Sequence, residues 1–226
     1  MSAPYPGLPK ASIAFLSDLA LHNDRDWMAR HRDAYERDWK QAGLALCRAL
    51  VAPAADIGLV VAPRVDGSLR RLHRDTRFSN DKRPFQTEMH LILSAGEPVG
   101  KRPGVHLVLG PLGMSYGVGE WRLAPDRLKA YRAALLDERR RAPLLRHIAA
   151  AEDMGCRFGA PDLAGMPRNI AAEGDWTHLL RRKSFVLRRH DPLPIPDAVF
   201  SRAAPDALIG VAAAMAPVAH WLAALP

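Results

Sequence analysis

Positively charged side chains are concentrated in one short segment of the chain, residues 70–83. Six of its 14 residues are cationic and two are acidic, so the segment carries half of the net charge of +8. The cations are Arg70, Arg71, Arg74, Arg77, Lys82 and Arg83, and the acids are Asp75 and Asp81. Guanidinium groups bind phosphate and carboxylate groups bidentately, and two acids cannot balance this many cations. The segment therefore predicts a site for a bound anion.

The spacing within the segment predicts which side chains share a face. In an extended chain, alternate side chains point to opposite faces. One face then carries Arg71, His73, Asp75 and Arg77, and the other carries Leu72, Arg74, Thr76 and Phe78. Burying the apolar residues of the second face must cover at least one arginine in part, and a covered guanidinium needs a partner. We expect Asp75 to contact an arginine bidentately and to have a lowered pKa.

The predicted ligand-binding residues are Arg71, Arg74, Asp75, Arg77, Asp81 and Lys82. If the protein is an enzyme, the arginines would stabilise developing negative charge, and Asp75 or His73 would transfer a proton. Three interpretations stay open. The first is a pocket for a small phosphate- or carboxylate-bearing ligand. The second is a nucleic-acid-binding module whose cations contact backbone phosphates. The third is a structural or partner-binding protein in which an Arg–Asp lattice holds the sheet. The sequence identifies no cofactor.

The same segment resembles the signature of an uncharacterised, mostly bacterial family, domain of unknown function 2461, which has the form R-x-x-R-D-x-R-F-x-x-[DN]-K-x-x-Y. The matching residues are Arg71, Arg74, Asp75, Arg77, Phe78, Asp81 and Lys82. Residues 22–27 and 117–121 resemble its Asn-Asn…Trp element and its Gly-Gly-x-Trp turn. The resemblance implies a bacterial α+β domain and brings no activity. Phe85 stands where the family usually has tyrosine, which argues against an essential phenol hydroxyl here.

Two other patterns are weaker signs of chemistry. Residues 113–117 fit the G-x-S-x-G pattern of a serine hydrolase, but glycines follow Ser115 where a nucleophile elbow requires a helix. We therefore predict a glycine-rich hairpin there. Glu88, His90 and His106 fall on neighbouring predicted strands and could meet across them. No metal-ligand spacing accompanies these three residues, and we predict no metal site.

Composition bounds the class of protein. A chain of 226 residues can bury a substantial core, and its two cysteines, Cys47 and Cys156, form no disulfide framework. The N-terminus shows no secretory signal. The most apolar stretch, 208–225, is interrupted by Pro217 and His220, which favours a buried helix over a membrane span. We expect a cytoplasmic protein without a membrane partner. The net charge fits an anionic partner, but an arginine-rich genome composition explains it equally well.

Periodicity predicts an α+β fold in a single domain, residues 1–226, with N-terminal helices, a central and mainly antiparallel sheet, and C-terminal helices. Helices are predicted over residues 12–21, from Asp24 through Trp39, over 44–54, from Pro125, and over 205–225. Strands are predicted over residues 69–75, 88–94, 105–109, 114–118 and 185–187. Their short connections indicate antiparallel pairing. Two runs of three cations, 139–141 and 181–183, are expected to be solvated surface.

Overall fold

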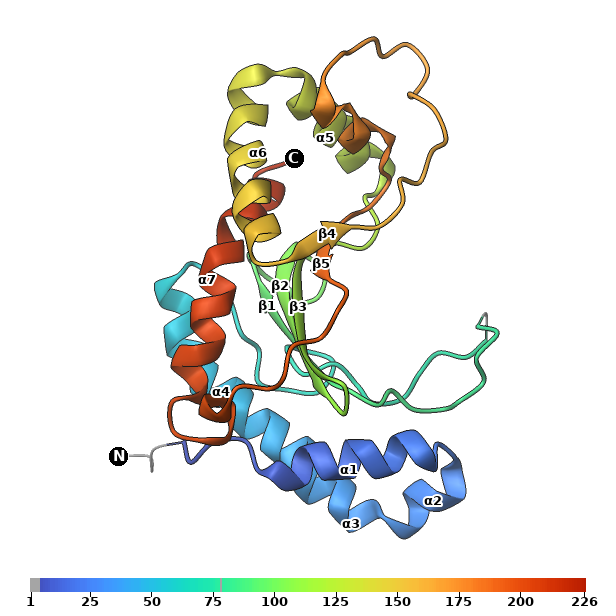
Figure 1. Cartoon of the computed structure of the whole chain (residues 1–226), viewed down its shortest axis with the longest axis vertical. Coiled ribbons are helices and arrows are strands. Elements are labelled where there is room, and N and C mark those ends of the chain that lie inside the picture. Colours follow the sequence, from blue (N-terminus) through green and yellow to red (C-terminus); the bar gives the residue numbers. More distant parts are fainter. Residues whose placement is uncertain (1–4, 78) are drawn as a thin grey trace.

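One antiparallel sheet organises the chain, whose computed structural model describes residues 5–77 and 79–226 (Figure 1). Its strands are β1 (Met89–Ser94), β2 (Gly104–Gly110), β3 (Gly113–Glu120), β4 (Cys156–Phe158) and β5 (Phe185–Arg189). They lie in the order β1-β2-β3-β5-β4, and every neighbouring pair is antiparallel. The predicted α+β class is confirmed. Strand β4 was not predicted, because three residues are too few to show an alternating pattern.

Helices precede and follow the sheet. The N-terminal elements are α1 (Lys10–Leu21), α2 (Arg25–Arg30), α3 (Arg32–Ala34), a π-helical stretch (Tyr35–Gln41) and α4 (Ala42–Asp56). The later ones are α5 (Pro125–Leu136), α6 (Glu138–Asp153) and α7 (Ala204–Ala223), with 3-10 turns at Asp175–Arg181 and Asp197–Phe200. The predicted second helix is therefore divided into α2, α3 and the π-helical stretch. Of the two residues that could cap its start, Asn23 and Asp24, the structure shows Asp24, which accepts a hydrogen bond from the Trp27 N–H at 2.7 Å.

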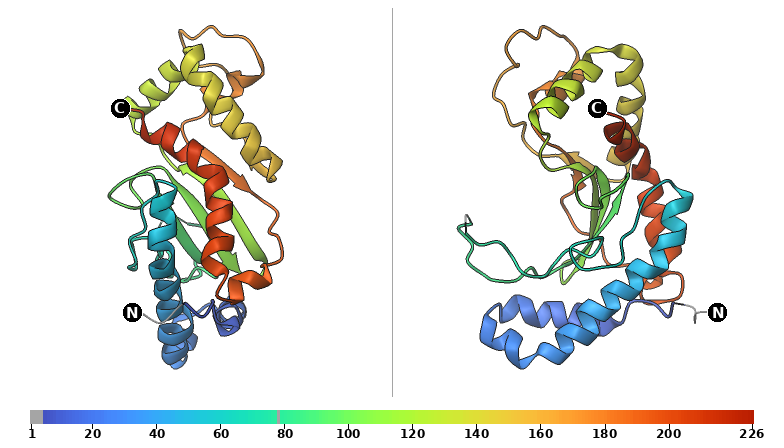
Figure 2. Two further views of the ribbon diagram at one scale, coloured as in Figure 1. Left: turned by 90° about the vertical axis from the view of Figure 1, so that its left-hand side faces the viewer. Right: turned by 180° about the vertical axis from the view of Figure 1, so that it is seen from behind.

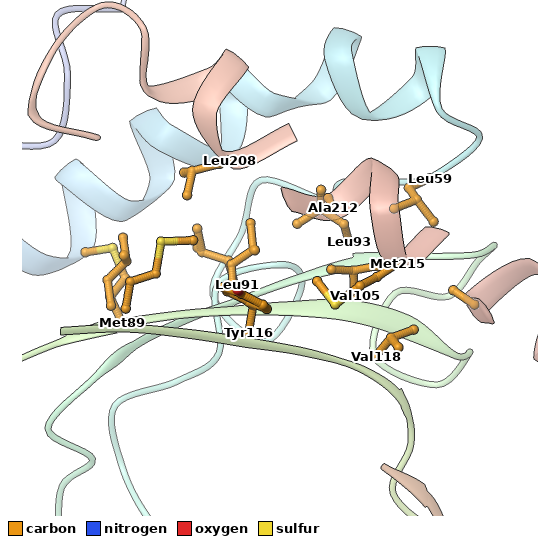
Figure 3. Packing of buried hydrophobic residues seen from close by; sticks show 14 of the residues in the cluster. Leu59, Met89, Leu91, Leu93, Val105, Tyr116, Val118, Leu208, Ala212 and Met215 are labelled. Carbon is orange, nitrogen blue, oxygen red and sulfur yellow. The ribbon is translucent and has the colours of Figure 1, made fainter. Parts of the chain in front are cut away.

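The hydrophobic core lies between one face of the sheet and the helices α4 and α7 (Figure 2). Because strand side chains alternate, Met89, Leu91 and Leu93 of β1 all point to this face. Leu208 and Met215 of α7 pack against the same face, and both are fully buried (Figure 3). The candidate site lies at the opposite face of the sheet, on the side to which His90 of β1 points.

Helix α7 corresponds to the apolar stretch near the C-terminus. By length and composition alone it is long and apolar enough to cross a membrane, a test that the core helix of a globular protein also passes. Its residues Leu208, Ala212, Met215 and Leu222 are fully buried, and the helix packs against β2, β3, α4 and α6. The helix is therefore buried along one face, and 39% of its most apolar window is buried.

The prediction of a continuous strand over residues 69–75 is wrong. The described part of the segment forms only isolated bridges: Leu69 pairs with Val65 and with Leu91 of β1, and His73 pairs with Phe85. Pro84 accepts a hydrogen bond from the Arg74 N–H at 2.8 Å, but proline has no N–H with which to return one. The ladder therefore cannot continue, and the segment leaves the sheet edge as an irregular arm.

Residues 181–183 were predicted to be solvated surface, and this prediction is wrong for Arg182. Arg182 is only 6% exposed. Its guanidinium lies over the ring of Phe158, 4.3 Å from the centroid, and donates to the carbonyl of Gly159 at 2.8 Å. Burial lowers the pKa of this arginine. A long cationic side chain can be covered in this way when an aromatic ring and a carbonyl replace water.

Strand β5 approaches β3 so closely that two positions of β3 must be glycine. A Cβ on Gly119 would lie 1.7 Å from the carbonyl oxygen of Phe185, and one on Gly117 would lie 2.6 Å from the Cβ of Arg188. Gly119 also has a φ of +152°, which other residues rarely adopt. Gly117 pairs with His106, so these glycines lie on the face away from α7, where β3 carries no side chain at these two positions.

We expect Gly119→Ala to destabilise the protein by on the order of 2 kcal/mol or more, because the methyl group must displace the β5 backbone. Gly165→Ala is the matched control, since a Cβ at Gly165 meets nothing within 4 Å, and its effect should stay within about 0.5 kcal/mol. Urea unfolding of both variants measures the difference. Equal stability of the two variants would contradict the close approach of β3 and β5.

Candidate functional site

The arm that follows the sheet edge keeps the alternation expected for an extended chain. It begins beside β1, where the Arg70 N–H donates to the carbonyl of His90 at 2.9 Å, and it projects on the side of α1 and α2 (Figure 1). Along it, Leu72 is buried, Arg74 and Thr76 are half-buried, and the exposed residues are Arg71, His73, Asp75 and Arg77. The predicted division of faces is thus confirmed as far as residue 77, and Phe78 lies outside the described residues.

The returning end of the arm is held by the N-terminal helices. Asn23 bonds both backbone groups of Phe85: its Nδ2 donates to the Phe85 carbonyl at 2.9 Å, and the Phe85 N–H donates to its Oδ1 at 3.0 Å. The Phe85 ring is buried and presents an edge contact to His73, with centroids 4.9 Å apart. The two-way bond joins residues 22–27 to the arm. The ring at position 85 has a packing role here that needs no hydroxyl.

Asp75 makes the bidentate arginine contact expected of it. Arg77 donates through Nε to Oδ1 at 2.9 Å and through its terminal nitrogen to Oδ2 at 2.7 Å. These hydrogen bonds lower the pKa of Asp75 to about 2. The pair is open to water, with 77% of the Arg77 side chain and 42% of the Asp75 side chain exposed.

Asp81 holds two further arginines. Arg83 donates to both of its carboxyl oxygens, at 3.0 and 2.7 Å, and Arg74 donates to Oδ2 from the other side. These hydrogen bonds hold the pKa of Asp81 well below its usual range. The Arg74 side chain is 19% exposed, so it is one of the two partly covered arginines of the segment, the other being Arg70. Asp75 and Asp81 together therefore engage three of the six cations.

The remaining arginines line a pocket of about 490 Å³, which we call the sheet pocket. Its lining residues are Arg70, Arg71, His73, Arg74, Asp75, Gln86, Glu88, His90 and Trp121. Within the described chain, neither Arg70 nor Arg71 has a carboxylate within ion-pair distance. The pocket thus combines two guanidinium groups that lack a protein counter-ion with a third, Arg74, that is already oriented by Asp81.

Lys82 lies elsewhere, in a shallower and more open hollow of about 700 Å³. This helix hollow is lined by Asn23, Asp24, Arg25, Asp26, Arg30, Thr76, Lys82, Arg83 and Pro84. Lys82 donates to the carbonyl of Thr76 at 3.0 Å. The structure therefore divides the predicted binding residues. Arg71, Arg74 and Asp75 line the sheet pocket, Lys82 lines the helix hollow, and Arg77 and Asp81 line neither hollow but pair with Asp75, Arg74 and Arg83.

His90 lines the sheet pocket and contacts a second histidine, His106. The ring nitrogens of His90 and His106 lie 2.8 Å apart. Burial lowers the pKa of His90 to about 3 and that of His106 to about 4, with Arg70 adding to both shifts. Both rings are therefore neutral at pH 7 and add no positive charge. In the described part of the chain, no three His, Cys, Asp or Glu residues are placed to hold a metal ion.

Trp121 is a pocket residue that our sequence reasoning did not assign to the site. It is 82% exposed, whereas Trp27 and Trp39 belong to the core. The only sequence signal for it is the resemblance of residues 117–121 to the Gly-Gly-x-Trp turn. Ser115 of the same hairpin lies within β3, and no helix follows it, so the predicted glycine-rich hairpin is confirmed.

Asp75 and His73, the two residues predicted to transfer a proton, have different surroundings in the structure. Asp75 stays ionised at neutral pH, and both of its oxygens are held by Arg77, so it orients a cation and is a poor proton donor. His73 is exposed in the pocket with only its ring edge packed on Phe85. Glu88 is a second carboxyl in the pocket, and partial burial raises its pKa. Within the described residues, the side chains of His73 and Glu88 line the pocket and form no ion pair with an arginine.

We expect Asp75→Asn to change the urea midpoint no more than an ordinary surface substitution, because water screens the exposed pair. Glu120→Gln is the comparison, since Glu120 pairs bidentately with Arg127 and both side chains are under 20% exposed. Glu120→Gln should lower the free energy of unfolding by at least about 1 kcal/mol.

The Asp75 effect should also depend on pH. The pKa of Asp75 is lower in the folded protein than in the unfolded chain, so its contribution is present above about pH 4 and is lost as the pH falls toward 2. The wild-type and Asp75→Asn midpoints should therefore converge in acid. If Asp75→Asn lowered the free energy of unfolding as much as Glu120→Gln does, the Asp75–Arg77 pair could not be open to water.

Comparison with known proteins identifies the family. The sequence model of the family described as "Conserved hypothetical protein (DUF2461)" matches residues 11–221. Comparison with curated proteins and with solved structures finds no match. Because the family match covers nearly the whole chain, including the arm, the sheet and all of its covering helices, the protein belongs to the DUF2461 family of conserved hypothetical proteins.

Proposed function

We propose that the protein binds a small anionic ligand, one bearing a phosphate or carboxylate group, in the sheet pocket. The observation that carries this proposal is the pair Arg70 and Arg71, which line the pocket without a carboxylate partner among the described residues. Arg74 lines the same pocket, oriented by Asp81. An anion that meets two or three guanidiniums gains charge-assisted hydrogen bonds that water cannot match in a partly enclosed site.

The structural interpretation accounts for a different part of the segment. The Arg–Asp lattice exists around Asp75 and Asp81, where each acid engages its own arginines. That lattice orients the arm. Its acids form no ion pair with Arg70 or Arg71, although the charge of Arg71 helps to lower the pKa of Asp75. Keeping two cations at a pocket without ion-pair partners is unfavourable for folding alone, since like charges repel. Ligand binding supplies a reason for their placement.

Arg71→Gln tests the proposal, with inorganic pyrophosphate as the ligand in calorimetric titrations at constant ionic strength. We expect pyrophosphate to bind the wild type and its affinity to fall about tenfold or more in the variant, the loss of one or two charge-assisted hydrogen bonds. Arg139→Gln is the matched control, because it removes the same charge from the exposed surface of α6. If both variants lost the same pyrophosphate affinity, or if the wild type did not bind pyrophosphate, the sheet pocket would not be the anion-binding site.

A nucleic-acid strand is the second candidate, and the helix hollow favours it. Arg25, Arg30, Lys82 and Arg83 line this hollow on the other side of the same arm. A polyanion that crosses the arm would meet the cations of both hollows, whereas a small anion needs only one of them.

Titration of a fluorescent single-stranded oligonucleotide at several salt concentrations tests this second candidate. If a strand crosses the arm, Lys82→Gln should weaken binding for every sequence and reduce the salt slope by about one unit. Pyrophosphate affinity should not change, because Lys82 does not line the sheet pocket. Absence of oligonucleotide binding at low salt would exclude the strand.

A further inference from the structure

The exposed indole of Trp121 lines the same pocket as the unpaired arginines, although a ring of this size is usually buried. Trp121 is 82% exposed, while Trp39 is fully buried and Trp27 is 6% exposed. Within the part of the chain that the structure describes, no other aromatic ring and no cation stacks on the Trp121 indole. A single exposed apolar residue needs no explanation by itself. Trp121 is set apart by the backbone that holds it and by the arginines that line the same pocket.

The backbone on both sides of Trp121 is firmly held. Before it, Glu120 forms a bidentate ion pair with Arg127, at 3.1 and 2.8 Å. After it, the N–H of the buried Leu123 donates to the carbonyl of Lys183 at 3.0 Å. Gly119 also fixes the end of β3 against β5. The ring is therefore exposed on a rigid support, and a site that is already ordered loses little entropy when a ligand binds.

Other lining residues of the pocket supply charge. Within the described residues, neither Arg70 nor Arg71 forms an ion pair, although the carboxylates of Asp75 and Glu88 line the same pocket. A volume of about 490 Å³ falls within the range of small-ligand sites, roughly 300–1,000 Å³. An inorganic anion would use only the arginines. A ligand that contacts both the arginines and Trp121 must carry an anionic group and a flat ring.

We infer that the sheet pocket binds an anion joined to a flat aromatic ring, of which a nucleoside phosphate is the simplest chemical class, with Trp121 as the platform on which the ring stacks. This inference rests on the proposed function, because the phosphate end uses Arg70 and Arg71. Stacking on an aromatic side chain tolerates different bases, since every base has a π-face. The platform therefore specifies a ring without specifying which base.

The test compares ADP with inorganic pyrophosphate, which share the diphosphate and differ in the adenosine. We expect the wild type to bind ADP at least about tenfold more tightly than pyrophosphate, a typical effect of one stacked base. Trp121→Ala should remove this preference while the pyrophosphate affinity stays unchanged, and Trp121→Phe should keep part of it. Leu112→Ala is the matched control, because Leu112 is equally exposed at 82% but does not line the pocket, and it should change neither affinity.

The outcomes separate this inference from the function on which it rests. If pyrophosphate binds through Arg71 but ADP binds no more tightly, the aromatic platform is refuted and the anion pocket stands. If neither ligand binds, both are refuted. A Trp121→Ala variant that loses pyrophosphate and ADP alike would show that Trp121 only supports the fold of the pocket. Binding of a single-stranded oligonucleotide through Trp121, without binding of ADP, would overturn the nucleoside phosphate in favour of a nucleic-acid strand.

Discussion

The burial of Leu72 and Phe85 between charged neighbours determines the geometry of the arm. Both side chains lie in the core, and alternate residues on an extended chain must face opposite ways. A shift of one residue would bury Arg71 and expose Leu72, so the register is strongly specified. Asn23 secures the same register by bonding both backbone groups of Phe85. The direction of the neighbouring cations follows from these few contacts.

The charges of the arm form two groups with different roles. From Asp75 onward, the acids hold Arg77, Arg74 and Arg83 in ion pairs that are mostly open to water. Such pairs add little to stability, but they order an arm that has little regular secondary structure. Nearer the sheet, Arg70 and Arg71 form no ion pair within the described residues, although Asp75 and Glu88 line the same pocket. The lattice and the proposed binding site, which are alternatives in the sequence, are neighbouring parts of one structure.

The sequence predicts the elements that follow a local period better than the site that they build. The strands β1, β2, β3 and β5 and the helix α7 follow from alternation or from apolar spacing, and the face pattern of the arm is local for the same reason. The division of the predicted site between two hollows depends on a contact between distant residues. Asn23, 62 residues from Phe85, binds the arm, and Lys82 therefore lies beside the N-terminal helices. Trp121 joins the pocket only through the fold of the sheet, and Arg182 is buried by a ring that the local sequence does not reveal.

A crystal soaked in tungstate, a heavy-atom mimic of phosphate, tests the central claim most directly. Anomalous scattering from tungsten locates the bound anion without assuming a ligand or a reaction. The account predicts a peak in the sheet pocket within hydrogen-bond distance of Arg71, together with Arg70 or Arg74. A peak only in the helix hollow beside Lys82, or no peak on the arm at all, would contradict it.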